Sequence, residues 1–136
     1  MTYLVERLAE LRRHLDHLEQ LRPRVTSQSL RDDLSLHNDV LYSLLTVCQL
    51  VIDIAGELSA QRREAFDDYT QAVRNLSHDP RFSAGLVERL AQLPGFRNVV
   101  IHEYMQIDFD RVVEALNGLE PIEEFIAILR RIATAP

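Results

Sequence analysis

Polar side chains that can do chemistry gather in one otherwise largely apolar segment, where Arg97, Asn98, His102 and Tyr104 lie close together. Arginine stays charged, and its planar fork of N–H donors matches a phosphate. Histidine has a reference pKa of about 6.5, so it can accept and donate protons near neutral pH. This combination suits RNA cleavage, in which the ribose 2′-OH attacks the adjacent phosphorus while protons move at the attacking and leaving oxygens.

The spacing of these residues decides whether they can meet. Pro94-Gly95 predicts a break in the chain, and the residues that follow are typical of a helix. On an ideal helix Tyr104 shares a face with Arg97, whereas His102 is about 140° away from it. Arg97 and His102 can converge if the long arginine side chain reaches round, or if a second copy of the helix faces the first. The spacing therefore favours a two-fold homodimer, which would bring two of each group to one cleft.

The string Arg97-Asn98-x3-His102-x-Tyr104 resembles the R-x4-H-x-Y motif of HepT-like proteins, which belong to the HEPN superfamily. The similarity continues more loosely, as a helical pattern, from about Leu30 to Ile132. It implies an all-α, HEPN-type antiparallel bundle of four to six helices that pairs as a two-fold homodimer. It also implies the toxin of a type VII-like toxin–antitoxin pair, a metal-independent endoribonuclease with Arg97 and His102 as its catalytic residues.

The resemblance gives Tyr104 a regulatory role. In HepT-like toxins the matching tyrosine is adenylylated by a partner nucleotidyltransferase antitoxin of the MntA type. AMP on Tyr104 would place a negative phosphodiester and extra bulk in front of Arg97 and so block the substrate phosphate. From the residues alone, Tyr104 can equally be an aromatic core residue with a satisfied hydroxyl. Asn98 can donate to a phosphate or hold His102 in one tautomer.

A narrow polar stripe runs along the longest expected helix, which spans about residues 30–58. Its apolar residues cover an arc of about 220° from Val40 onward, which is typical of the central helix of a bundle. The stripe consists of Tyr42, Thr46, Gln49, Asp53 and Glu57. It can face solvent, or it can line a cleft in which the carboxylate of Asp53 orients a cation such as Arg97. The sequence leaves both interpretations open.

Apolar spacing and breaking residues predict the other helices of a single HEPN-like domain, residues 1–136. We expect a helix over about 4–18 that ends near Pro23, and Ser27 or Ser29 as the N-cap of the helix over 30–58. Further helices are expected over about 62–76 and 82–93, then over the motif, from Asp108 or Asp110 to Asn117-Gly118, and from Pro121 to about Ile132. No strand-like alternation is present.

Composition limits the possible functions. The formal net charge is −6 and the pI is about 5.3, so RNA binding would have to rest on a local site or on a surface made by assembly. The single Cys48 lies in an apolar run and is typical of a small buried hydrophobe in a reducing compartment. The apolar run from Leu44 to Ala55 is too short to span a bilayer. We therefore expect a cytoplasmic protein without a membrane segment.

We expect neither a metal nor a cofactor. His14 and His17 lie at i, i+3 and could share a metal, but no third ligand is forced close to them, and surface histidines are the simpler interpretation. The competing function is a non-catalytic HEPN binding module or the nucleotide-binding subunit of a nucleotidyltransferase complex. An RNA-cleavage assay separates it from an endoribonuclease.

Overall fold

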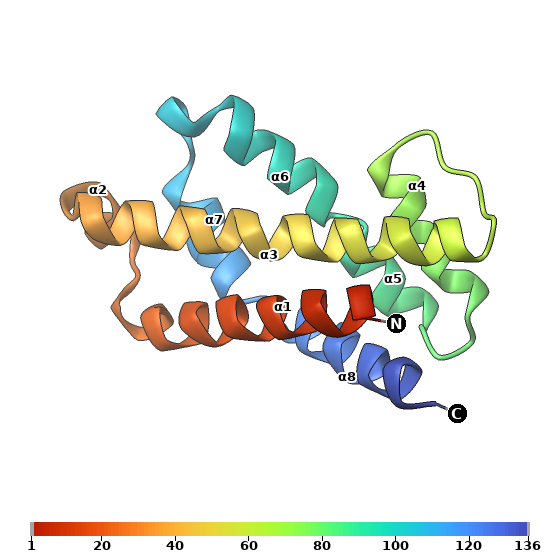
Figure 1. Cartoon of the computed structure of the whole chain (residues 1–136). Coiled ribbons are helices and arrows are strands. Elements are labelled where there is room, and N and C mark those ends of the chain that lie inside the picture. The colour runs from red at the N-terminus through yellow and green to blue at the C-terminus, as the bar shows by residue number, and fades with distance from the viewer. Residues whose placement is uncertain (1, 136) are drawn as a thin grey trace.

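A computed structural model describes the backbone of residues 2–135; the side chains of Thr2 and Tyr104 lie outside the described residues. In this part of the chain every regular element is a helix (Figure 1). The α-helices are α1 (Thr2–Leu21), α2 (Ser27–Asp32), α3 (Leu34–Gln61), α4 (Tyr69–Arg74), α5 (Ala84–Leu90), α6 (Leu93–His102), α7 (Phe109–Leu116) and α8 (Glu120–Thr134). Short 3-10 helices, η1 (Arg22–Arg24), η2 (Asn75–His78) and η3 (Tyr104–Gln106), join them. The predicted all-α class is confirmed, with more helical segments than expected because short helices form in connecting stretches.

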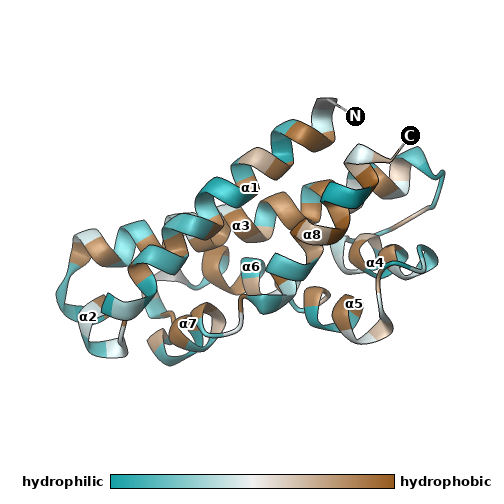
Figure 2. Cartoon of the chain, turned by 90° about the horizontal axis from the view of Figure 1, so that it is seen from below, coloured by the Kyte–Doolittle hydropathy of each residue, from teal (hydrophilic) through white to brown (hydrophobic). Residues whose placement is uncertain are grey.

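Helix α3 lies at the centre of the bundle, with α1 antiparallel along one side and α6 on the other (Figure 1). Leucines at i, i+3 and i+4 make the inner face of α1, and Leu11, Leu15 and Leu18 are fully buried. They join Val51 of α3 and Phe125 of α8 in one apolar cluster. Helix α3 is largely hydrophobic, whereas α1 alternates between hydrophilic and hydrophobic residues (Figure 2).

Helix α3 is long and apolar enough to cross a bilayer by length and composition alone. The expectation that its apolar run is too short therefore does not extend to the whole helix. Burial distinguishes a membrane span from a core helix better than length does, and 61% of the most apolar window of α3 is covered inside the fold. Neighbouring helices already shield that surface, which is the arrangement of a core helix.

The long helix begins later than predicted, at Leu34, because Asp33 has an extended backbone and its carboxylate accepts a hydrogen bond from Leu36 N at 3.1 Å. Neither Ser27 nor Ser29 is an N-cap of α3. Thr26 caps the separate helix α2 instead, through a capping box with Ser29. The expected helix over 30–58 is thus two helices with a break at Asp33.

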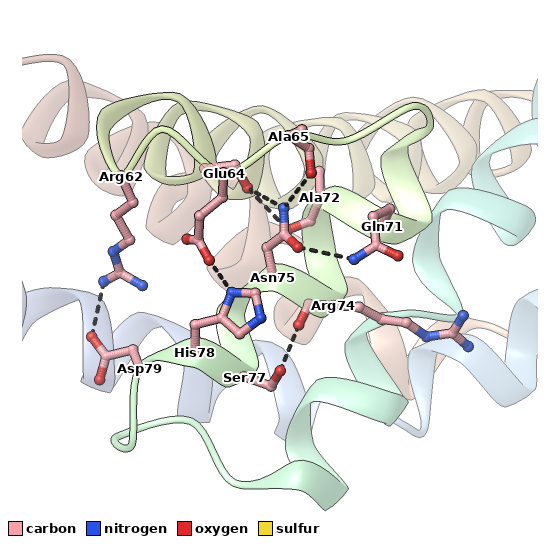
Figure 3. Close-up of polar contacts among 11 residues, drawn as sticks. Arg62, Glu64, Ala65, Gln71, Ala72, Arg74, Asn75, Ser77, His78 and Asp79 are labelled. Carbon is pink, nitrogen blue, oxygen red and sulfur yellow. Dashed lines mark hydrogen bonds and ion pairs between the residues drawn. The ribbon is translucent and has the colours of Figure 1, made fainter.

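The helix predicted over 62–76 is also shorter, since residues 62–68 form a loop. Arg63 adopts a left-handed conformation with a φ of 56°, which ends α3, and the Asp68 carboxylate caps α4 by accepting from Gln71 N at 2.8 Å. The loop is held by the buried Asn75, whose side chain donates to Ala65 O at 3.2 Å (Figure 3). The loop is therefore anchored to the bundle rather than helical.

The predicted break at Pro94-Gly95 is wrong. Both residues lie in the first turn of α6, where a proline is tolerated because the N–H it lacks has no intrahelical partner there. The chain turns just before, at Ala91 and Gln92, and α5 ends at Leu90 rather than at Leu93. The later boundaries agree with the prediction: Asp108 caps α7, and α8 carries Pro121 in its first turn.

Candidate active site on helices α3 and α6

Arg97 of α6 is half-buried and contacts the side chains of three other residues. Its Nε donates a hydrogen bond to Gln49 Oε1 of α3 at 2.5 Å, and its Nη1 donates to Asn98 Oδ1 at 3.0 Å. The guanidinium carbon lies 5.5 Å from the ring centroid of Tyr69, a cation–π contact. A guanidinium has five N–H donors, and these contacts use two of them. Among the side chains that the structure describes, none accepts from the remaining donors, which can therefore bind a phosphate.

Asp53 takes part in this arrangement indirectly. Gln49 Nε2 donates to Asp53 Oδ1 at 2.7 Å, so the carboxylate orients the Gln49 amide with its oxygen toward Arg97. The pKa of Arg7 of α1 is raised chiefly by a hydrogen bond to Tyr3 and to a smaller degree by the charge of Asp53. Part of the polar stripe thus contacts Arg97. The sequence identified the stripe but not Gln49 as the direct partner.

His102 is the last residue of α6, and its side chain is exposed. No hydrogen bond or ion pair joins it to another of the residues whose side chains are described. Within one chain the structure therefore does not bring His102 and Arg97 together, as their angular separation on a helix predicted. His102 is exposed and Arg97 is half-buried, so neither side chain is enclosed in the core.

Tyr104 follows the end of α6 instead of continuing it. Glu103 caps the helix, and Tyr104 begins η3. The expectation that Tyr104 shares a helical face with Arg97 is therefore wrong, because that face ends at His102. The phenol was predicted to lie beside Arg97; the side chain of Tyr104 is outside the described part of the structure. Asn98 is exposed and contacts Arg97 rather than His102.

Cys48 lies on the buried side of α3 near Arg97. Burial raises the pKa of its thiol to about 12, a rise that the nearby positive charge of Arg97 only partly opposes. The thiol is therefore protonated at neutral pH. This agrees with the interpretation of Cys48 as a small core residue.

The paired histidines of α1 take separate partners. His17 Nε2 lies 2.8 Å from Asp39 Oδ1, whereas His14 Nε2 is 3.7 Å from Glu10 Oε2 and its ring is near that of Tyr42. In the part of the chain that the structure describes, no group of three or more His, Cys, Asp and Glu side chains is placed to hold a metal ion.

The sequence and the fold both match known proteins. Residues 11–129 match the family model described as Ribonuclease HepT-like. A protein named mRNA nuclease HepT, from Shewanella oneidensis, is 25% identical over 134 residues, which cover 93% of this chain and 96% of that protein. A protein named putative RNase, from Archaeoglobus fulgidus, is 29% identical over 117 residues, covering 83% and 87% of the two chains.

Solved structures share the fold. The tri-AMPylated Shewanella oneidensis HEPN toxin in complex with MNT antitoxin superposes with a TM-score of 0.81 at 22% identity, covering 93% of this chain and 96% of that one. A toxin–antitoxin structure with AMP-PNP superposes with a TM-score of 0.84 at 21% identity, covering 96% and 98%. The chain belongs to the HepT-like ribonuclease family and has the HEPN fold, as its motif predicted.

Proposed function

We propose that this protein is a metal-independent endoribonuclease, the toxin of a type VII-like toxin–antitoxin pair. The observation that carries the proposal is the Arg97 guanidinium, which Gln49 and Asn98 hold in place while donors remain for a phosphate, on the helix that ends in the exposed His102. Membership of a ribonuclease family supports the same reaction.

In the proposed reaction, His102 accepts the proton of the ribose 2′-OH as that oxygen attacks the adjacent phosphorus. The bond from phosphorus to the 5′-oxygen breaks, leaving a 2′,3′-cyclic phosphate, and the 5′-oxygen takes up a proton. Arg97 stabilises the charge that gathers on the phosphoryl oxygens, a contribution typically worth about 3–4 kcal/mol of barrier. All the proton transfers use protein groups or water, so the reaction needs no metal.

The separation of Arg97 and His102 within one chain supports a homodimer in which two α6 helices face each other. The partner's His102 would then supply the second titrating group, as the acid that protonates the leaving oxygen. Residues 1–136 would act as a single domain in each subunit. RNA and nucleoside triphosphates are both present in the cytoplasm, where we place the protein.

For neutralisation, we propose that an MntA-like nucleotidyltransferase transfers AMP from ATP to the phenol oxygen of Tyr104, with release of pyrophosphate. One related toxin structure is described as tri-AMPylated and in complex with its MNT antitoxin, which supports this route. Tyr104 follows His102 by two positions, so the added phosphate would be close to the catalytic histidine and could compete with the substrate for Arg97.

RNA cleavage by purified protein in EDTA tests the proposal. We expect His102→Ala and Arg97→Ala to lose cleavage while keeping the helical circular dichroism spectrum. His17→Ala, which removes a histidine outside the site, should cleave normally. Cleavage that persists in His102→Ala, or that requires added metal, would overturn the mechanism. Tight binding of the nucleotidyltransferase with no cleavage by the unmodified protein would favour the non-catalytic binding module.

A further inference from the structure

A pocket of about 500 Å³ lies beside Arg97 and is lined by side chains that the proposed reaction does not use. Its walls come from the loop before α4, from the first residues of α4 and from α6, and they include Phe66, Asp67, Tyr69 and Asn98. Phe66 is 36% exposed and Tyr69 is 46% exposed, so both rings are accessible to a ligand in the pocket. Two accessible rings at one pocket provide flat surfaces on which another ring can stack.

The pocket is directly connected to the proposed phosphate site. The guanidinium carbon of Arg97 lies 5.5 Å from the ring centroid of Tyr69, and Asn98 Oδ1 accepts a hydrogen bond from Arg97 Nη1 at 3.0 Å. A cation that binds phosphate thus adjoins aromatic rings that can stack on a base. A nucleotide likewise carries a phosphate and a base close together, on one sugar.

Charge decides which part of a nucleotide enters the pocket. Asp67 and Asp68 both line it, so a phosphate would be repelled, whereas a base carrying N–H donors would be attracted. The Asp68 carboxylate already accepts from Gln71 N as the cap of α4. Asp67 is exposed, and its carboxylate makes none of the hydrogen bonds found among the described side chains. Asp67 is therefore the acceptor available to a base.

The chemistry of the four bases makes the preference specific. Guanine presents adjacent N1–H and N2–H donors that can bind both oxygens of one carboxylate, an arrangement that gives both strength and direction. Adenine and cytosine offer an amino group next to an acceptor, and uracil offers a single N–H flanked by acceptors. An exposed carboxylate beside a stacking platform hence favours guanine.

The wall of the pocket is held in place before any ligand arrives. Asn75, which is 4% exposed, donates to Ser59 Oγ and to Ala65 O, both at 3.2 Å, and accepts from Gln71 Nε2 at 2.9 Å (Figure 3). His78 of η2 contacts the Glu64 carboxylate, which belongs to the loop (Figure 3). These contacts fix the segment that carries Phe66 and Asp67, so little ordering is needed on binding.

We infer that this pocket is a nucleobase subsite that prefers guanine and receives the base of the nucleotide whose phosphate binds Arg97. The inference rests on the proposed function, because it identifies part of the RNA that the same site would cut. The rings of Tyr69 and Phe66 stack on the base, and Asp67 accepts its N–H donors.

Binding of the four ribonucleoside 3′-monophosphates to the His102→Ala protein tests the subsite without any cleavage. Amide chemical shifts measured during each titration give both the affinity and the location. We expect 3′-GMP to bind about tenfold more tightly than 3′-UMP, with the largest shifts at residues 66–70 and at Asn98. Equal affinities, or shifts centred elsewhere, would overturn the inference.

Variants separate stacking from hydrogen bonding. Tyr69→Ala should weaken 3′-GMP about tenfold and Tyr69→Phe should restore it, because stacking needs the ring but not the hydroxyl. Asp67→Asn should reduce the preference for 3′-GMP over 3′-UMP to about twofold, because an amide offers only one acceptor. The matched variants Tyr42→Ala and Asp32→Asn change an exposed tyrosine and an exposed aspartate outside the pocket and should keep the wild-type values. A preference that survives Asp67→Asn would refute the role of the carboxylate.

The two proposals fail in different ways. If the protein cleaves RNA but shows no base preference in the titrations, the subsite is refuted and the ribonuclease stands. If 3′-GMP binds at residues 66–70 but the protein does not cleave RNA, the ribonuclease is refuted and the pocket remains a guanine-nucleotide site.

Discussion

Gln49 and Arg97 are 48 positions apart in the sequence, yet Gln49 Oε1 accepts a hydrogen bond from Arg97 Nε at 2.5 Å. This bond spans the packed helices α3 and α6, so the central helix of the bundle fixes the direction of the guanidinium on the motif helix. Because the bond uses Nε, it leaves N–H groups of both terminal nitrogens for a phosphate. Positioning of Arg97 is thus a property of the fold, not of the motif alone.

Gln49→Ala should lower kcat/KM for RNA cleavage by about tenfold, because a charged group loses one orienting hydrogen bond. Steady-state cleavage of a short RNA gives the value. Gln20→Ala, which changes an exposed glutamine of α1, is the matched control and should leave the rate unchanged. An unaltered rate in Gln49→Ala would mean that Arg97 positions itself without α3.

Asp53 should act on catalysis only through Gln49. Asp53→Ala is expected to lower kcat/KM less than Gln49→Ala does, and to add almost nothing when Gln49 is already alanine. A double-mutant cycle on kcat/KM measures this coupling. Full additivity of the two effects would show that Asp53 contacts the substrate or Arg97 independently of Gln49.

Tyr104→Phe should keep RNA cleavage and cell toxicity but escape neutralisation, because the phenylalanine has no oxygen to receive AMP. Mass spectrometry of the protein co-expressed with an MntA-like nucleotidyltransferase measures AMP-sized additions. Tyr42→Phe, at an exposed tyrosine of α3, should still be modified at Tyr104. AMP found on the Tyr104→Phe protein would place the modification on a different residue.

Arg63→Gly should stabilise the fold by about 1 kcal/mol, because a side chain in the left-handed region is strained and glycine is not. The φ of Arg63 is 56°, and no other non-glycine residue of the described chain has a positive φ. Urea unfolding at an unchanged m-value gives the difference. Arg24→Gly, at a residue without positive φ, should instead lose stability, because glycine has more conformational freedom in the unfolded chain. An equal gain there would show that relief of left-handed strain is not the source.

Asp79→Asn should destabilise the protein by about 2 kcal/mol at neutral pH. Asp79 is buried and accepts from Arg81 Nη2 at 2.8 Å and Arg62 Nη2 at 2.9 Å, and the hydrogen bonds from Arg81 are the largest cause of its lowered pKa. A lowered pKa gives stability that is fully present above the unfolded value of 3.8. The difference between wild type and variant should therefore shrink as the pH falls from about 5 toward 3. A difference that is constant over this range would exclude the charge as its source.

Local signals in the sequence identified the helices that have strong apolar spacing, such as α1, the N-cap of α7 at Asp108 and the start of α8 near Pro121. They failed where a side chain fixes the start of a helix through one hydrogen bond. Asp33 and Asp68 each accept from a backbone N–H three positions further on, and both lie inside patterns that apolar spacing alone extends as helix. Apolar spacing does not detect such a bond, because the capping residue is polar in either case.

The motif singled out Arg97 and His102 as candidate site residues, but it did not predict how Arg97 is held. Gln49 belongs to the same stripe as Asp53, one helical turn earlier, and its longer side chain reaches Arg97 while Asp53 supports it from behind. Tyr69 could not be predicted, because its approach to Arg97 depends on a loop that only the tertiary structure closes. Long-range packing supplied both contacts.

The single guanidinium held by Gln49 sits on a chain of net charge −6. Each phosphate contact with single-stranded RNA changes the logarithm of affinity by about −0.7 per logarithm of salt concentration, through counterion release. With few cations in the cleft, the affinity for RNA would fall only slowly as the salt concentration rises. Binding would then persist at ionic strengths that dissociate RNA from a basic groove. The small number of cations also gives little electrostatic attraction for RNA of any sequence. The choice of target would then depend on contacts with bases.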